Sequence, residues 1–344
     1  MESIHEILEE LAKTKEKAAL ATIVHVEGSA YRKEGTAMLI KQDGSTVGLL
    51  SAGCLEEDVV ARTEDVINNG PCLVTFDMKE EHDLAWGAGA GCNGEVQVLV
   101  EPIDAAYRHY LLTLKSYLDR NQPVLMSKKM TEADPGISCW FSTLEGEAFG
   151  RWQGSLPDRQ LECKITEIRS GLHQQYGSTA PLYIHCFRPK PKLTVFGAGP
   201  DARPLVSFAA KAGFSVTVAD WRPALCTKEH FPEADQLVIG FPEEIREQLS
   251  FSETEACVVL THHFMKDQEL LMFLVDEPLY YLAVLGSRDR TARLLGTDEF
   301  PSHLKTPAGL DIGAEGPEQI AISIVGQLIE STASNKTTAE VVAS

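Results

Sequence analysis

The sequence of 344 residues lacks the features that define several classes of protein. No apolar run approaches the roughly 18 residues that a membrane helix requires, so we expect no membrane-spanning segment. No block of Lys or Arg offsets the formal net charge of −19, and this balance argues against nonspecific binding of nucleic acid. The first ten residues have neither a basic start nor an unbroken apolar stretch, so we expect no secretory signal peptide.

Closely spaced cysteine pairs are also missing. Eight cysteines stand at positions 54, 72, 92, 139, 163, 186, 226 and 257, and none forms a Cys-x-x-Cys pair. This spacing argues against a zinc knuckle, a thioredoxin-type redox pair and a disulfide-rich scaffold. We therefore expect a protein of the reducing cytoplasm, in which most thiols are small buried apolar groups.

The most informative stretch that is present covers residues 193–205, read together with residues 215–220. A short apolar run breaks at Gly197 and Gly199, a helical pattern follows, and a second Val-rich run ends at Asp220. This is the order of a βαβ dinucleotide-binding unit. Gly197 permits a tight turn, Gly199 lets backbone amides approach a phosphate, and the amino end of the helix favours an anion. Asp220 is then placed to accept hydrogen bonds from a ribose diol.

More short apolar runs of the parallel-strand type follow this unit. They cover residues 236–239, 256–260 and 280–285, and helical patterns lie between them at about 242–249 and 266–276. The C-terminal part of the chain is therefore predicted to be α/β, with a Rossmann-like, doubly wound parallel sheet.

Two of these later strands end in side chains capable of chemistry. His262 and His263 follow one strand, and Ser287 and Arg288 follow the next. In doubly wound sheets the ligand crevice lies at the carboxyl ends of the strands. Adjacent histidines point in different directions, so we expect at most one to face the crevice and no two-histidine metal site. Arg288 either pairs with a ligand phosphate or covers helix surface, and both roles remain open.

The N-terminal part has the mixed pattern of an α+β domain. An amphipathic helix opens the chain, another is predicted over residues 104–120, and residues 188–192 form a linker because its prolines at 189 and 191 exclude a helix. We place an α+β domain at 1–188, a Rossmann-like domain at 189–334 and a flexible tail at 335–344. Strands are predicted at 18–26, 36–40, 46–50, 72–76, 95–101, 124–126, 137–141, 148–149 and 183–187.

Two cysteines of this part stand beside glycines. Cys54 lies just before, or in the first turn of, a predicted helix, where the helix dipole stabilises a thiolate, although residues 56–58 are acidic and oppose a second negative charge. Cys92 lies in the glycine-rich segment 86–94, which suits either a flexible connection or a close backbone approach to a ligand. Taken alone, each thiol is either reactive or structural.

Together these motifs, in this order, resemble the XdhC/CoxI family of accessory proteins for molybdenum hydroxylases such as xanthine dehydrogenase. The resemblance covers nearly the whole chain. The matching motifs are residues 28–32, 35–38, 51–56 and 91–94 in the first part, and 196–205, 220–222, 231–235, 261–263, 285–288 and 309–315 in the second.

The resemblance implies that the protein binds the molybdenum cofactor, protects it while its metal centre is sulfurated, and delivers it to an apo-hydroxylase. It also implies contact with a cysteine desulfurase, and a homodimer is the expectation for a protein of this type. Cys54 and Cys92 would then be soft ligands or sulfur-side contacts, and Arg32 would pair with the pterin phosphate. The expected cofactor contacts are Arg32, Gly53, Cys54, Cys92, Gly197, Gly199, Pro200, Asp220, Arg222, Ser287 and Arg288.

Three residues depart from the family pattern. Tyr31 stands where the family has Pro, and Ala52 and Asn93 stand where it has Gly beside each cysteine. Side chains therefore replace bare backbone next to both thiols. If the ligand needs close approach there, its pose or identity differs from that of the family.

Two other functions remain open from the residues. The first is an NAD(P)-dependent oxidoreductase, for which Asp220 favours NAD, Arg222 weakens that preference, and His262 or His263 would be the catalytic base. The second is a catalytically silent assembly protein that uses the fold as an interaction surface. A hydroxylase itself is not expected, because the sequence lacks the cysteine clusters of iron–sulfur centres.

Overall fold

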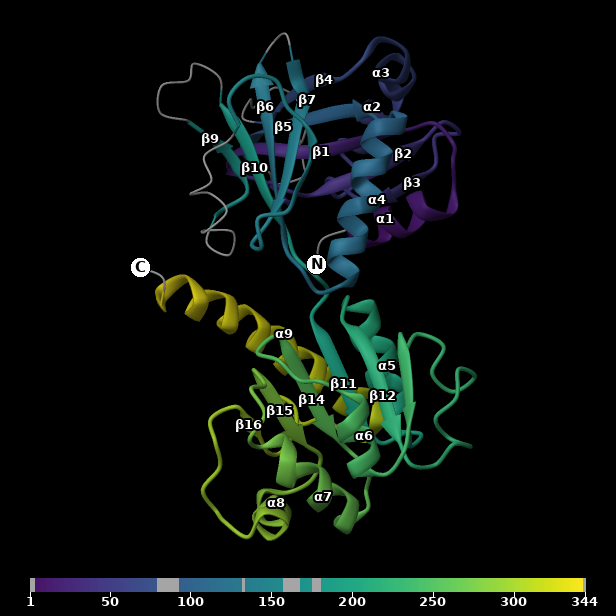
Figure 1. The fold of residues 1–344 in the computed structure, drawn as a ribbon, viewed down its shortest axis with the longest axis vertical. Helices are drawn as coiled ribbons and strands as arrows, with labels where there is room; N and C mark the ends of the chain where they lie inside the picture. The colour runs from purple at the N-terminus through teal and green to yellow at the C-terminus, as the bar shows by residue number, and fades with distance from the viewer. Residues whose placement is uncertain (1–3, 79–92, 132–133, 157–167, 175–180, 343–344) are drawn as a thin grey trace. The chain divides into compact units, whose positions relative to one another are not determined.

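The computed structural model describes residues 4–78, 93–131, 134–156, 168–174 and 181–342. The chain divides into two compact units, Met1–Pro189 and Lys190–Ser344, each with its own sheets and helices (Figure 1). Among the residues described, no helix is long and apolar enough to cross a membrane.

The first unit contains two antiparallel sheets of five strands each. Their strand orders are β3-β2-β1-β5-β4 and β8-β7-β6-β10-β9. This mixed architecture confirms the α+β prediction. The strands are β1 (Ala18–Ser29), β2 (Ala37–Lys41), β3 (Thr46–Gly48), β4 (Cys72–Asp77), β5 (Asn93–Pro102), β6 (Val124–Thr131), β7 (Asp134–Thr143), β8 (Ala148–Arg151), β9 (Gly171–His173) and β10 (Leu182–Phe187); the helices are α1 (Ile4–Lys13), α2 (Glu56–Ala61), α3 (Thr63–Asn69) and α4 (Ala105–Asp119).

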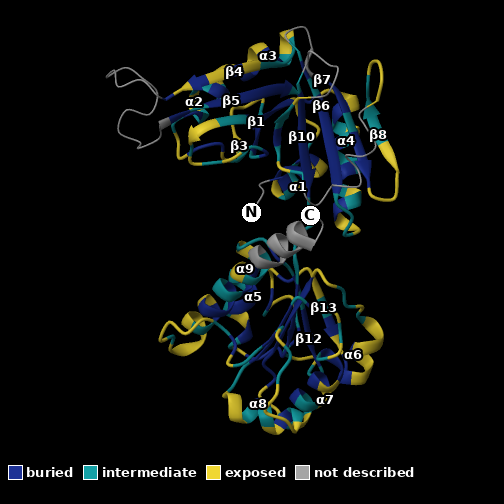
Figure 2. Cartoon of the chain, turned by 90° about the vertical axis from the view of Figure 1, so that its left-hand side faces the viewer, coloured by how far each residue is buried: buried dark blue, intermediate teal, exposed yellow. Residues whose placement is uncertain are grey.

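Strand β1 separates two hydrophobic cores. Its alternate side chains point to opposite faces of the sheet, so Leu20 and Val24 pack with α1, α4 and the second sheet, whereas Ala21 and Ile23 pack with α2 and α3. Because both faces of β1 are covered, its first seven residues are all buried (Figure 2). The loop that leads into α2 therefore rests directly on a closed core.

A buried ion pair connects the two sheets of the first unit. Lys128 of β6 is 1% exposed, and its Nζ donates hydrogen bonds to the carboxylate of Glu101 on β5 and, at 2.9 Å, to the hydroxyl of Tyr107 on α4. Burial raises the pKa of the Glu101 carboxyl, although the lysine opposes this effect. Desolvation offsets most of the attraction within such a buried pair, so the pair adds little net stability.

The second unit is a parallel sheet of six strands with helices on both faces. Its order is β13-β12-β11-β14-β15-β16, which confirms the predicted doubly wound sheet. Helices α5 and α9 cover one face and α6, α7 and α8 the other. The elements are β11 (Lys192–Phe196), α5 (Ala202–Lys211), β12 (Ser215–Asp220), β13 (Gln236–Ile239), α6 (Pro242–Gln248), β14 (Glu255–Val259), α7 (Phe264–Leu274), β15 (Tyr281–Val284), α8 (Arg288–Leu295), β16 (Leu304–Lys305) and α9 (Gly316–Val342).

The strand order reverses between β11 and β14. From β11 the chain proceeds to β12 and β13 on one side, then crosses to β14, β15 and β16 on the other. The carboxyl ends of β11 and β14 therefore flank the topological switch point, where open α/β sheets bind ligands.

Several elements differ from the sequence-based expectation. Strands β9 and β16 and helix α8 are short and were not predicted. The helix predicted after Cys54 is interrupted at Arg62, which caps α2 and precedes α3. Helix α9 continues to Val342, through most of the segment expected to be a flexible tail, since no glycine or proline interrupts it there.

Candidate functional site

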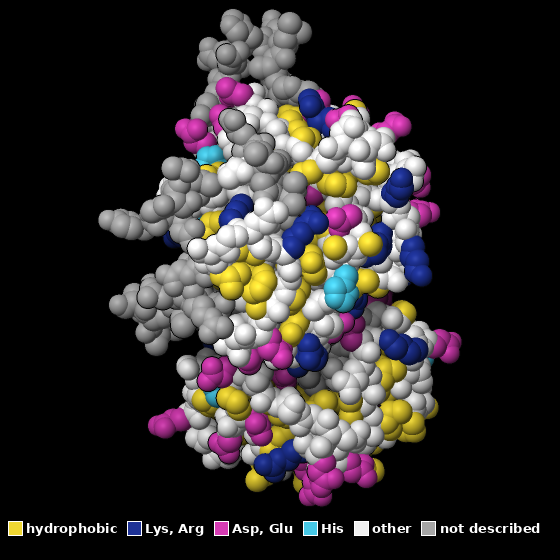
Figure 3. Space-filling view, turned by 45° about the horizontal axis from the view of Figure 1, so that its top comes forward, with side chains coloured by type: hydrophobic (Ala, Val, Ile, Leu, Met, Phe, Trp, Pro, Cys, Tyr) yellow, Lys and Arg dark blue, Asp and Glu magenta, His cyan; other side chains and the backbone are white. Residues whose placement is uncertain are grey.

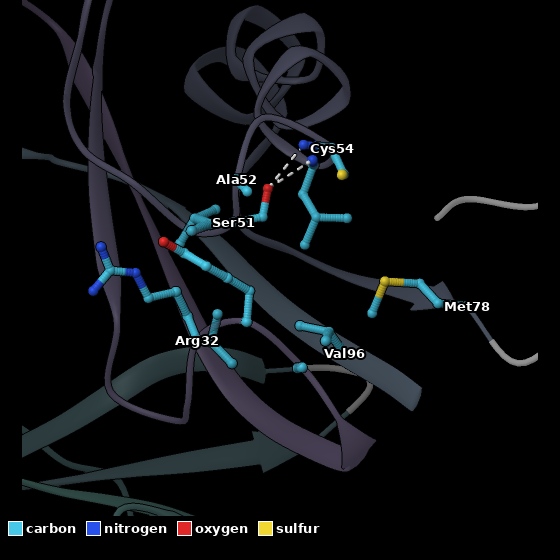
Figure 4. A pocket seen from close by; sticks show the side chains of 11 residues that line it. Arg32, Ser51, Ala52, Cys54, Met78 and Val96 are labelled. Carbon is cyan, nitrogen blue, oxygen red and sulfur yellow. Dashed lines mark hydrogen bonds between the residues drawn. The ribbon is translucent and has the colours of Figure 1, made fainter. Parts of the chain in front are cut away.

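The loop from Leu50 to Leu55 folds around one hydroxyl group. The Ser51 Oγ accepts hydrogen bonds from the backbone N–H groups of Gly53, Cys54 and Leu55, at 3.2, 2.9 and 3.1 Å. Figure 4 shows two of these bonds converging on Ser51 beside Cys54. This arrangement holds Cys54 directly before α2, as the sequence predicts.

The Glu56 carboxylate fixes the same loop from the first turn of α2. It accepts hydrogen bonds from the Leu50 N–H (3.1 Å), the Ser51 N–H (2.7 Å), the Ser51 hydroxyl (2.5 Å) and the Leu55 N–H (3.2 Å). Burial alone would raise the pKa of Glu56, but the hydrogen bonds from Ser51 outweigh it and the pKa lies below its ordinary value. The loop therefore keeps a negative charge bound to its backbone at neutral pH.

Cys54 lines a small, open pocket whose walls are mostly apolar. Figure 4 places Arg32 and Met78 at opposite sides of this pocket. The Nε of Arg32 is buried and has no hydrogen-bond partner among the residues that the structure describes. The other residues that line the pocket are Ile23, Ala30, Tyr31, Leu50, Ser51, Ala52, Leu55 and Val96.

Gly53 leaves open space beside Cys54. Its φ is +107°, a conformation that side-chain-bearing residues rarely adopt, and a Cβ built there would meet no atom within 4 Å. The pocket region thus offers a thiol, an unpartnered guanidinium N–H and exposed backbone. Ser51, Glu56 and Met78 were not singled out from the sequence, although the serine and the acid lie within the same short motif as Cys54.

Cys92 lies outside the described residues. The segment that contains it begins after Met78, which lines the pocket, and ends at Asn93, which pairs with Ser29 of β1. The predicted partnership of Cys54 and Cys92 therefore remains a prediction.

The glycine turn of the second unit has the geometry that the fingerprint predicts. Gly197 has a φ of +119°, and a Cβ there would lie 2.6 Å from the carbonyl oxygen of Leu260. A Cβ on Gly199 would lie 2.5 Å from the Asp201 carboxylate. Gly197 therefore excludes a larger residue, because the close contact is with backbone, whereas at Gly199 only the end of the Asp201 side chain would have to move.

Most amides of this turn are already used within the chain. The N–H of Ala198 donates to Asp220 at 2.6 Å, and the N–H groups of Ala202 and Arg203 donate to the carbonyls of Gly199 and Pro200. Pro200 has no N–H at all. A dinucleotide pyrophosphate binds through such amides, so part of the cradle expected from the sequence is already used within the chain.

Asp220 is buried and fully hydrogen-bonded by the chain. Its two carboxylate oxygens accept four bonds, from the Ala198 N–H and from the backbone and guanidinium of Arg222. Burial opposes ionisation, but these bonds outweigh it and hold the pKa of Asp220 below its ordinary value. A ribose diol would therefore have to displace Arg222 from the position that the sequence assigns to the sugar.

The two adjacent histidines diverge, as the sequence predicts. His262 has a φ of 58°, and its Nε2 lies 2.5 Å from the Asp201 carboxylate at the amino end of α5. His263 instead caps α7, where its Nδ1 accepts a bond from the Lys266 N–H, and it packs edge-on against Trp221. Only His262 thus faces the glycine turn, where it holds a carboxylate in the place expected for an anionic ligand. No group of three His, Cys, Asp or Glu side chains suited to a metal ion occurs in the described part of the chain.

Ser287 and Arg288 have local roles at the start of α8. The Ser287 hydroxyl caps the helix by accepting a bond from the Arg290 N–H, and the Arg288 guanidinium lies over the Phe300 ring and donates to the Asp298 carbonyl. Arg288 thus covers the Phe300 ring, and its pairing with a ligand phosphate remains a prediction.

Sequence reasoning missed a buried network next to this helix. Arg290 donates at 2.5 Å to the Asp267 carboxylate, which also accepts a bond from the Thr261 hydroxyl. Helix α8, which carries Arg290, was not predicted. The only sequence signal for this network was therefore Asp267, an acid in the first turn of α7. The network joins the ends of two strands and stabilises the carboxyl edge of the sheet.

Family models and curated relatives both match this chain over most of its length. A family model for the XdhC Rossmann domain matches residues 193–328, one for the XdhC and CoxI family matches 11–77, and one for the BH1974-like central domain matches 105–188. The chain is 43% identical to a probable xanthine dehydrogenase subunit of Bacillus subtilis over 96% of this chain and 98% of that protein. It is 21% identical to the molybdenum cofactor insertion chaperone PaoD of Escherichia coli over 90% of this chain and 82% of that protein.

A solved structure extends the likeness to three dimensions. The crystal structure of a xanthine dehydrogenase (BH1974) from Bacillus halodurans matches with a TM-score of 0.86 and 42% identity, covering 97% of this chain and 96% of that one.

Proposed function

Because the chain belongs to the XdhC and CoxI family, we propose that it is an accessory protein that binds the molybdenum cofactor, protects it and delivers it to a molybdenum hydroxylase of the xanthine dehydrogenase type. Two relatives support this proposal. One is named as a probable subunit of xanthine dehydrogenase, and the other as a molybdenum cofactor insertion chaperone. The cofactor is cargo in this proposal, so the protein needs a binding site rather than a catalytic centre.

The pocket at Cys54 is the observation on which the proposal rests. A thiol suits the soft, thiophilic metal centre of such a cargo, and the unpartnered Nε of Arg32 suits a phosphate oxygen. The open backbone at Gly53 permits close approach beside the thiol. Cys92 is proposed as a second sulfur contact on sequence grounds alone.

The surrounding residues determine how the pocket would hold its cargo. Ser51 and Glu56 fix the backbone on both sides of Cys54, so the thiol is positioned before the cargo arrives and little ordering entropy is lost on binding. The apolar walls, including Val96 and Met78, exclude water from the metal side of the cargo. The apolar composition of the pocket supports the proposed protection of a reactive centre.

The geometry of the second unit does not favour an NAD(P)-dependent oxidoreductase. Several of its turn amides are used within the chain, and Arg222 takes the bonds of Asp220 that a ribose would need. We propose that this unit is a scaffold and interaction module instead. Its glycine turn, with Gly197, Gly199 and Pro200, remains a secondary candidate for the phosphate of the cargo if the Asp201 carboxylate moves away.

The proposed partners are a cysteine desulfurase, the apo-hydroxylase and a second copy of the chain, all in the cytoplasm. On the face shown in Figure 3, Lys and Arg side chains lie scattered among Asp and Glu side chains. Such a surface suits contact with other proteins rather than with a polyanion.

The experiment is purification of the protein from a host that makes molybdopterin, followed by measurement of the bound pterin by fluorescence after oxidation. We expect close to one pterin per chain, a loss of most of it in Cys54→Ser, and no change in Cys72→Ser, a half-buried thiol that does not line the pocket. Absence of pterin from the unaltered protein, or equal pterin in both variants, would contradict the proposal.

A further inference from the structure

The loop between β1 and β2 carries one wall of the Cys54 pocket, because residues 30–32 line it. The base of this loop is bound to Ile23 of β1, which is itself a pocket residue. The Gly35 N–H donates to the Ile23 carbonyl, and the Ile23 N–H donates to the Thr36 carbonyl, both at 2.9 Å. A shift of Gly35 therefore reaches the pocket both through the loop and through the wall.

The second sheet of the first unit supports the base of this loop. A Cβ built on Gly35 would lie 2.3 Å from the Cε1 atom of His185 on β10, so the backbone at Gly35 rests directly on the imidazole ring. The preceding residue, Glu34, lies over β9, since a Cβ built on Gly171 would lie 3.7 Å from its Cγ atom. The support thus comes from β9 and β10, whereas the residues that line the pocket all lie between positions 23 and 96.

The imidazole ring of His185 is held in place. It is 3% exposed, its Nδ1 lies 2.6 Å from the Ser170 hydroxyl, and the Phe187 ring packs edge-on against it with 4.5 Å between centroids. A small cavity bounded by Gly35 and His185 lies beside the ring. Removal of the ring would therefore leave the base of the loop without support on that side.

We propose that His185 positions the loop that carries Tyr31 and Arg32, and thereby sets how tightly the pocket holds its cargo. Ile23 of β1 lines the pocket and its neighbour Thr22 lines the cavity at His185, so the two spaces lie on opposite faces of one strand. His185 thus acts through the loop and touches no cargo. The second sheet is the positioning element of a pocket that the first sheet forms.

The rate at which a thiol reagent labels Cys54 in the cargo-free chain tests this positioning without any cargo. Cys72, which is also half-buried but does not line the pocket, is the reference in the same molecule, and peptide mass spectrometry separates the two. Gly35→Ala drives a Cβ into the His185 ring, so we expect the Cys54 rate to rise about tenfold relative to Cys72. Gly44→Ala is the matched control, because Gly44 has a φ of +83° but the nearest atom to a Cβ there would be 4.0 Å away.

A double variant separates positioning from a general loss of stability. In Gly35→Ala/His185→Ala the new methyl group fills part of the space that the ring leaves, so we expect the Cys54 rate to return most of the way to that of the unaltered protein. A merely structural role would predict a further rise, since the double variant also lacks a buried side chain. His185→Ala alone is expected to raise the Cys54 rate several-fold, and it decides the test if Gly35→Ala does not fold.

Retention of cargo by the same variants deepens the proposed function, on which this second measurement rests. In protein from a host that makes molybdopterin, we expect Gly35→Ala to lose most of the bound pterin and the double variant to recover it. A Cys54 rate unchanged in both single variants, a double variant labelled as fast as Gly35→Ala, or equal pterin in the unaltered protein and all variants would overturn the inference. Shifted Cys54 rates together with an unaltered protein that carries no pterin would uphold the positioning and contradict the proposed cargo.

Discussion

The Ser51 hydroxyl donates a hydrogen bond of 2.5 Å to the Glu56 carboxylate while it accepts three backbone N–H groups of its own loop. The two side chains together bind the backbone on either side of Cys54. The position of the thiol therefore depends on a serine and a glutamate that touch no sulfur themselves.

Replacement of Glu56 tests this dependence. Glu56→Gln presents an amide to donors that need an acceptor, so we expect a loss of about 1–3 kcal/mol of stability and faster labelling of Cys54 by a thiol reagent. Glu57→Gln, in the same turn but exposed, is the matched control. Because the folded-state pKa of Glu56 is depressed, its contribution is present above the ordinary value of 4.5 and is lost as pH falls through the folded pKa. Equal labelling rates in the two variants would show that the loop does not depend on this carboxylate.

Gly197 offers a test of the turn in the second unit. Gly197→Ala combines a positive φ with a Cβ 2.6 Å from the Leu260 carbonyl, so we expect a loss of more than about 2 kcal/mol. Gly296→Ala is the control, because Gly296 has a φ of 70° but open space around it, and a loss of about 1 kcal/mol is expected there. Chemical denaturation of both variants gives the comparison, and similar losses would mean that the close contact with Leu260 is relaxed at no cost.

The buried imidazole of His185 is expected to make the free energy of unfolding depend on pH. Burial lowers its pKa from 6.5 to about 4, and the nearby Arg188 adds to the effect. Between pH 4 and pH 6.5 the His185 imidazole therefore binds a proton in the unfolded chain but not in the native state. Stability is therefore full above pH 6.5 and falls by about 3 kcal/mol as pH decreases to 4.

The variant His185→Asn should flatten the pH profile across that interval, while His109→Asn, at an exposed position, should leave it unchanged. Denaturant midpoints measured between pH 4 and 7 provide the test. An unaltered slope in His185→Asn would assign the acid sensitivity to other groups.

The bonds between Asp220 and Arg222 lead us to expect that nucleotides do not bind the second unit. Because Arg222 and Ala198 use both carboxylate oxygens, we expect no saturable binding of NAD, NADH or NADPH up to about 1 mM by calorimetry. Asp220→Ala should instead lower stability by leaving the guanidinium unpaired. Micromolar binding of a nucleotide that Asp220→Ala abolishes would restore the oxidoreductase function.

The fold of the second unit could be predicted from the sequence more fully than the chemistry of its side chains could. The glycine turn, the strand that ends at Asp220 and the divergence of His262 and His263 follow from local rules of backbone and strand geometry. The use of Asp220 by Arg222 does not, because it depends on which rotamer a side chain two residues away adopts. Short elements such as β16 have no pattern of their own and form only against a neighbouring strand.

The pocket at Cys54 could likewise be predicted only in part from the sequence. The position of Cys54 before a helix was evident from spacing, and the family resemblance made it a candidate site residue. Its other walls, from Ile23 on β1 to Val96 on β5 and Met78 after β4, come together only when antiparallel strands pair over a long sequence separation. Such long-range pairing is not encoded in any single window of the sequence.

Titration of the cofactor-free protein with molybdenum cofactor measures binding at the Cys54 pocket itself. We expect saturable binding at one site per chain, weakened at least about tenfold by Cys54→Ser and by Arg32→Ala and unchanged by Lys33→Ala, an exposed neighbour. Affinity that is the same in all four proteins, or no saturable binding in any, would contradict a cofactor site at this pocket.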